Sequence, residues 1–138
     1  MAIINSTTAE IILDEILSTH DGKILAISII DLKGNIIASK STESFSKEFG
    51  KFKKGPEYGG TLATAALSIA NEVRAIAGET IAITNTYERC KMMLIPIPPY
   101  EILVGFVLKR RVVLDEERIA KYIEGFVAEN ATKGNTTT

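Results

Sequence analysis

Groups that commonly carry catalysis or bind metal ions are scarce in this sequence. Its 138 residues include one cysteine, Cys90, and one histidine, His20, and no tryptophan. A lone cysteine excludes an internal disulfide, so we expect a reducing compartment, the cytoplasm. One cysteine and one histidine do not make a zinc ligand set. We therefore expect no metal, no cofactor and no enzymatic activity, with His20 at a helix end and Cys90 as a half-buried thiol.

Excess charge and long apolar runs are also missing. The formal net charge is −1, so the protein as a whole would not attract a polyanion. The first residues contain no basic segment before an apolar run, and no apolar run approaches the length of a membrane span. Neither a signal peptide nor a membrane helix is expected, and nucleic acid and membranes are not expected as partners.

The remaining composition is typical of a globular protein with one core, at 46% hydrophobic and 24% charged residues. Hydrophobic periodicity predicts three helices, over residues 7–22, 61–78 and 114–130. Apolar and β-branched runs predict five strands, over residues 24–30, 36–39, 80–85, 91–97 and 101–109. We expect one domain over residues 1–129. Residues 130–138 have nothing to bury and are expected to form a disordered tail.

The strand sequences predict how these elements are layered. The runs "MMLIPI" and "ILVGFVL" do not alternate apolar with polar residues, which is typical of a sheet covered on both faces. The element order is α-β-β-α-β-β-β-α. We therefore predict a three-layer α/β sandwich with a five-stranded, mainly antiparallel sheet. The middle helix covers one face, and the two terminal helices cover the other.

The middle helix carries two apolar stripes at helical spacing. The first, which we expect to face the sheet, consists of Leu62, Ala66, Ile69, Val73 and Ile76. The second consists of Ala63, Leu67, Ala70 and Arg74. Small alanines would let a second helix approach closely, so we predict that the second stripe packs on a twofold-related copy. The alternative is that the alanines serve helix propensity alone.

The third strand supports a dimer. The segment "TIAITN" contains neither lysine nor proline, the residues that usually protect an exposed sheet edge. An unprotected strand edge next to an apolar helix face favours edge-to-edge pairing between two copies. The predicted contribution of this strand to the interface consists of Thr80, Ile81, Ala82, Ile83, Thr84 and Asn85.

The segment 43–57 combines phenylalanines with a cluster of lysines. Phe45, Phe49 and Phe52 are spaced four and three residues apart, so a short helix would place them on one face that docks on the domain. Alternatively, the aromatic and basic residues bind nucleic acid or an anionic membrane. In either case the candidates for contacting a partner are Lys47, Lys51, Lys53 and Lys54.

The element order resembles the roadblock/dynein light chain family. The same family is resembled by two stretches of sequence: the first hairpin, "SIIDLKGNIIASK", and the segment "ALSIANEVRAIAG" leading into "IAITNTYERCKMMLIPI". The resemblance covers residues 9–127, and profilin-like and longin-like domains share much of this layout. It implies a homodimer in which the third strands pair edge to edge and the middle helices lie side by side. It also implies a non-enzymatic platform or regulator for small Ras-like GTPases, or a partner among other roadblock-type subunits.

Three functions are thus compatible with the sequence. The leading interpretation is a dimeric scaffold or regulatory module that binds or regulates a small Ras-like GTPase. The alternative is an adaptor that binds nucleic acid or anionic membrane through residues 43–57. A small-molecule sensor with a pocket between helix and sheet ranks last, because nothing in the sequence places polar ligands there.

Overall fold

A computed structural model describes residues 6–19, 23–43, 45, 47, 55–113 and 115–136. The helices are α1 (Ser6–Thr19), α3 (Gly55–Ala77) and α4 (Glu116–Thr136), with a short 3-10 turn, η1, at Pro98–Tyr100. The strands are β1 (Ile24–Asp31), β2 (Ile36–Ser41), β3 (Ile83–Thr86), β4 (Cys90–Ile97) and β5 (Ile102–Lys109). They form one sheet in the order β2-β1-β5-β4-β3, and every neighbouring pair is antiparallel.

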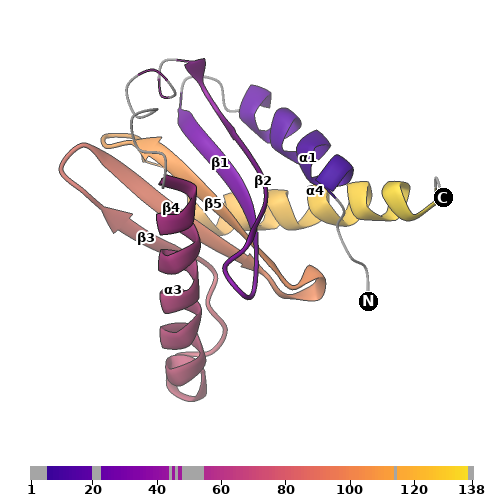
Figure 1. The fold of residues 1–138 in the computed structure, drawn as a ribbon. Coiled ribbons are helices and arrows are strands. Elements are labelled where there is room, and N and C mark those ends of the chain that lie inside the picture. The colour runs from indigo at the N-terminus through magenta and orange to yellow at the C-terminus, as the bar shows by residue number, and fades with distance from the viewer. Residues whose placement is uncertain are drawn as a thin grey trace.

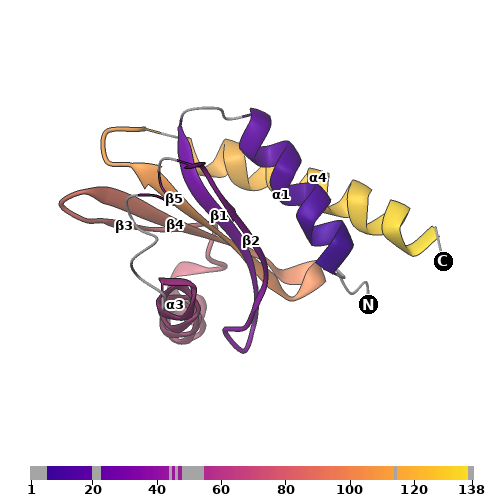
Figure 2. The same ribbon diagram turned by 45° about the horizontal axis from the view of Figure 1, so that its top comes forward.

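The helices cover the sheet as the sequence predicted. Helices α1 and α4 lie side by side on one face, and α3 lies on the other (Figures 1 and 2). The strand runs that lack alternation are explained by this arrangement, because both faces of β4 and β5 contact apolar neighbours. The predicted three-layer α/β sandwich is confirmed.

Most of the described core lies between the sheet and the pair α1 and α4. Alternate residues of β5 point into it, and so do inward residues of both helices. The larger cluster comprises Ala9, Ile12, Leu13, Ile16, Ile24, Ile27, Ile29, Met93, Ile95, Ile97, Ile102, Val104, Phe106, Leu108, Ile119, Ile123 and Val127. The smaller cluster, under α3, comprises Ile30, Ala63, Ala66, Leu94 and Leu103.

The first hairpin turn is organised by one carboxylate. Asp31 Oδ1 accepts hydrogen bonds from the backbone N–H groups of Lys33 and Asn35, each at 2.9 Å, and Oδ2 accepts one from the Asn35 side-chain amide at 3.1 Å. Gly34 in this turn has a positive φ of 89°, a conformation that glycine adopts without a steric penalty. Burial alone would raise the pKa of the Asp31 carboxyl, but these hydrogen bonds outweigh burial and lower the pKa.

Several element boundaries differ from the sequence prediction, and three of these differences have a physical explanation. Helix α3 begins at Gly55 rather than at residue 61, because Pro56 in its first turn has a backbone φ that suits a helix start. Strand β3 begins at Ile83 rather than Thr80. The register that pairs Ile83 with Leu94 would bring Ile81 opposite Pro96, which has no N–H to continue the ladder.

The third difference is at the end of α4, which runs to Thr136 and so enters the segment expected to be a tail. Extending an existing helix costs little, because each further residue adds a hydrogen bond without a new nucleation step.

Candidate interaction surface on α3 and β3

The two edges of the sheet differ in how they are protected. Edge strand β2 carries Lys40, whose Nζ pairs with Asp14 Oδ1 of α1 at 3.0 Å, and α1 packs against this strand. Edge strand β3 carries neither lysine nor proline, and in the part of the chain that the structure describes it pairs only with β4. Unpaired N–H and C=O groups on such an edge can pair with a further strand. The β3 edge is therefore available for strand addition.

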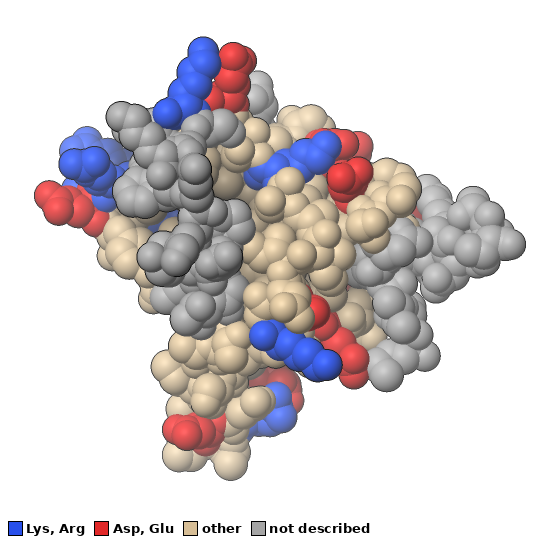
Figure 3. Space-filling view, viewed as in Figure 1, with Lys and Arg blue, Asp and Glu red and all other residues tan. Residues whose placement is uncertain are grey.

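The exposed face of α3 carries large branched side chains. Ile69, Val73 and Ile76 are 63%, 40% and 92% exposed. In the space-filling view the projecting end of α3 presents mainly uncharged atoms, with a few charged side chains beside them (Figure 3). We call Ile69, Val73 and Ile76 the α3 stripe. Clustered exposed apolar side chains of this kind mark interaction sites more often than chance surface.

The orientation of α3 corrects the sequence prediction. Of the stripe predicted to face the sheet, Ala66 is buried there, but Ile69, Val73 and Ile76 are exposed. Ala63, predicted at the dimer interface, is fully buried under the helix, and Leu67 packs against the smaller cluster. Only the N-terminal half of the helix lies over the sheet, and its C-terminal half projects past it (Figure 1). Alanines at the contact let the helix backbone approach the strands closely, so the larger residues are left outside.

The four interface residues predicted on α3 therefore differ in how far they are buried within the single chain. Ala63 is covered within the single chain, and Leu67 and Ala70 are half-buried. Arg74 is exposed, with its Nε 3.1 Å from Glu79 Oε1 and its Nη2 donating to Asn71 Oδ1 at 3.0 Å. Of these four residues, Arg74 alone has an exposed side chain.

The predicted residues of strand three remain at the edge. Ile81 and Asn85 are exposed, and Thr80 is half-buried. Ala82 and Ile83 pack partly against the two core clusters. Thr84 Oγ1 donates a 2.7 Å hydrogen bond to Glu116 Oε1, which ties β3 to the first turn of α4.

A groove of about 530 Å³ runs between α3 and the turns at one end of the sheet. It is lined by Leu32, Thr64, Leu67, Ser68, Ala70, Asn71, Arg74, Glu79, Thr80, Pro96, Pro98, Glu101 and Ile102. The one cation of this lining, Arg74, is already paired with Glu79. The groove is therefore a weak candidate for a charged small-molecule ligand.

The basic candidates of segment 43–57 are only partly described. Lys47 is exposed, and its Nζ lies 3.4 Å from Glu43 Oε1. Lys51, Lys53 and Lys54 lie outside the described residues, so their role stays a prediction.

The residues with potential for chemistry are few. Cys90 is half-buried, and burial raises the pKa of its thiol, which disfavours the reactive thiolate. His20 lies outside the described residues. Across the described ranges no three His, Cys, Asp or Glu side chains gather as metal ligands. No helix in those ranges combines the length and apolar character needed to cross a membrane.

Neither a family model nor a curated protein matches the sequence. Several solved structures match the fold of this chain. The gliding protein MglB from Thermus thermophilus is 19% identical, with 96% of each chain covered and a TM-score of 0.64. A structure of MglB with a tetrameric arrangement is 20% identical, with 96% of each chain covered and a TM-score of 0.64.

The roadblock/LC7 domain from Streptomyces avermitilis is 6% identical. The alignment covers 96% of this chain and 95% of that domain, with a TM-score of 0.58. The whole described architecture is thus shared with these structures, although few residues are. By its fold, the chain is a roadblock-like α/β domain.

Proposed function

We propose that this protein is a non-enzymatic, homodimeric scaffold or regulatory module that binds or regulates a small Ras-like GTPase. The observation that carries the proposal is the exposed α3 stripe next to the unprotected β3 edge. Five residues, 78–82, connect these two features, so one partner can engage both. The roadblock-like fold supports the proposal, as does the tetrameric arrangement recorded for a structure of MglB. A cytoplasmic location belongs to the same proposal.

The proposed dimer pairs β3 with β3 of a second copy and joins the two sheets. A twofold contact uses the same patch on both chains, so Ile69, Val73 and Ile76 of each copy pack on those of the other. Burying these six side chains supplies the hydrophobic term, and the strand pairing fixes the register. This interface keeps the predicted strand but replaces Ala63 and Leu67 with the α3 stripe.

The proposed GTPase role is supported by the scarcity of side chains suited to catalysis and by the resemblance to roadblock domains. The described residues hold no metal-ligand cluster, and Cys90 is a poor nucleophile at neutral pH. Two α3 helices side by side would form a broad platform on one face of the dimer. Such a platform acts by holding a GTPase or by shifting the population of its conformations.

The test is capture of Ras-like GTPases from the proteome of the source cell, followed by hydrolysis measurements with the purified pair. We expect binding that differs between the GDP-bound and GTP-bound states and a hydrolysis rate that changes by about tenfold. The Ile69→Asp/Ile76→Asp variant should lose both. A matched control is Ile11→Asp, which alters an exposed isoleucine of α1 on the opposite layer. Failure to capture any Ras-like GTPase would contradict the proposal.

A further inference from the structure

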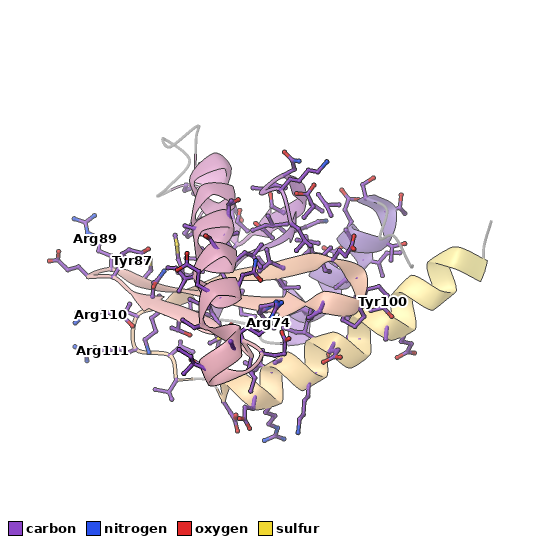
Figure 4. The ribbon with its side chains drawn as sticks, turned by 90° about the horizontal axis from the view of Figure 1, so that it is seen from below. Arg74, Tyr87, Arg89, Tyr100, Arg110 and Arg111 are labelled. Carbon is purple, nitrogen blue, oxygen red and sulfur yellow. The ribbon has the colours of Figure 1, made fainter. Side chains whose placement is uncertain are left out.

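Two turns far apart in the sequence meet at one end of the sheet. The register of β4 and β5 pairs Cys90 with Lys109, so Arg89 and Arg110 follow at neighbouring strand ends. Arg89, Arg110 and Arg111 all extend outward from this end, and Tyr87 lies beside them (Figure 4). We call residues 87–91 and 109–113 the basic tip.

Charge is concentrated in the basic tip. It holds five of the 16 Lys and Arg residues of the chain but one of the 17 Asp and Glu residues, Glu88. Like charges at neighbouring strand positions repel one another. None of the ion pairs within the described residues involves Arg89, Lys109, Arg110 or Arg111. An anionic partner would relieve this repulsion.

The backbone holds the two central arginines in place. The Val112 N–H donates to the Lys109 carbonyl oxygen at 3.1 Å, which closes a β-turn with Arg110 and Arg111 at its corners. Lys91 Nζ donates to the Val112 carbonyl oxygen at 3.0 Å and ties this turn to β4. A pre-organised turn loses little conformational entropy on binding.

The basic tip also exposes one apolar and one aromatic side chain. Val113 is 86% exposed, and Tyr87 is 41% exposed. Arginines beside a protruding apolar residue suit the interface of a lipid bilayer, where tyrosine also prefers to lie. Single-stranded nucleic acid is usually held on several aromatic side chains, and the tip offers one. The observations therefore favour a lipid surface over nucleic acid.

We propose that the basic tip docks the protein on an anionic phospholipid membrane. Arg89, Arg110 and Arg111 contact lipid phosphates, and Val113 enters the headgroup region. This differs from the sequence expectation that membranes are not partners. That expectation relied on the net charge of the whole chain, whereas the fold gathers cations from two separate turns. It also differs from the alternative based on residues 43–57, because none of the tip residues belongs to that segment.

The test measures binding of the full chain to vesicles of phosphatidylcholine with about 30 mol% phosphatidylserine at low salt. Arg110→Glu/Arg111→Glu should weaken binding at least about tenfold, because each cation near the surface contributes about fivefold. Lys33→Glu/Lys121→Glu changes the net charge equally at exposed positions outside the tip and should change binding less than about twofold. Arg110→Gln/Arg111→Gln repeats the test with a milder change, and circular dichroism checks that each variant folds.

Val113→Ser separates the apolar contribution from the charge. It should weaken vesicle binding about fivefold while leaving the salt dependence unchanged. Equal binding to vesicles of pure phosphatidylcholine would overturn the proposal. So would an equal loss in the Lys33→Glu/Lys121→Glu control. Oligonucleotide binding that the arginine variants abolish, without vesicle binding, would instead identify nucleic acid as the partner.

Discussion

The two faces of the sheet are covered to very different extents. On one face α1 and α4 bury a continuous apolar cluster whose members include Ile12, Ile16 and Ile123, all inaccessible to solvent. On the other face α3 covers a small cluster with alanines and leaves its own large branched residues outside. The first face is complete within one chain. The second has apolar surface that a partner would complete.

This difference separates the residues that stabilise the fold from those available for association with a partner. A buried residue under α1 and α4 contributes to folding of the single chain, because its contacts are intramolecular. A residue of the α3 stripe has few intramolecular contacts to lose, so its substitution should act on association. The following predictions test that separation, in order of decreasing effect.

Truncation under α1 and α4 should have the largest effect on folding. Ile123→Ala removes a fully buried side chain and leaves a cavity, so the free energy of unfolding should fall by about 2–5 kcal/mol. Chemical denaturation measures this. Ile11→Ala, at a 53% exposed position, is the control and should change stability by less than about 0.5 kcal/mol. Similar losses in both variants would contradict the assignment of the main core.

Charges on the α3 stripe should break the dimer while leaving the fold intact. Ile69→Asp/Ile76→Asp buries carboxylates at the proposed interface, so the dissociation constant should rise about a hundredfold, or about 3 kcal/mol. Sedimentation at several concentrations measures it, with Ile11→Asp as control. A wild-type chain that is monomeric at about 10 μM would refute the proposed dimer.

Removing the Asp31 carboxylate from the β1–β2 turn should have an intermediate effect on stability. This turn borders the groove beside α3. Asp31→Ala removes the hydrogen bonds from Lys33 and Asn35 and should cost about 1 kcal/mol at neutral pH. Because the folded-state pKa of Asp31 is lowered, this stabilisation is present above the unfolded-state pKa of about 3.9 and is lost as the pH falls through the folded-state pKa.

The difference between wild type and Asp31→Ala should therefore shrink on acidification below about pH 4. Denaturation curves at a series of pH values measure it, and Asp31→Asn, which keeps an acceptor without the charge, is the control. A difference that grew with acidification would contradict the assigned hydrogen bonds.

The smallest effect is expected under α3. A Cβ at Gly105 would lie 3.3 Å from Leu94 Cδ2 and 3.5 Å from Ile30 Cδ1, both at the ends of flexible side chains. Small shifts of these ends should accommodate Gly105→Ala, and alanine reduces the entropy of the unfolded chain. The net change in unfolding free energy should stay within about 0.5 kcal/mol, measured by denaturation. A loss above about 2 kcal/mol would show that this face is packed as tightly as the other.

Much of the fold could be predicted from local patterns. The strand runs of β4 and β5 and the apolar spacing of α1 and α4 each determine a nearby structure. The rotation of α3 could not be predicted in this way. Both of its stripes are apolar, and residues of both face the sheet, because the contact depends on how closely the helix approaches Ile30, Leu94 and Leu103.

The candidate surfaces divide in the same way. The sequence identified the β3 edge, because the absence of lysine and proline is a local feature. It attributed the helix contact to Ala63 and Leu67, and it did not find the basic tip. That tip exists because the register of β4 and β5 brings Arg89 next to Arg110.

By itself, the sequence determined the element order, the two-sided sheet and the scarcity of cysteine and histidine, since these follow from hydrophobic period and composition. Only the tertiary structure decided which face of α3 is exposed and which cations share one end of the sheet. The physical reason is that both depend on distances between segments far apart in the chain, which strand register and helix packing set together.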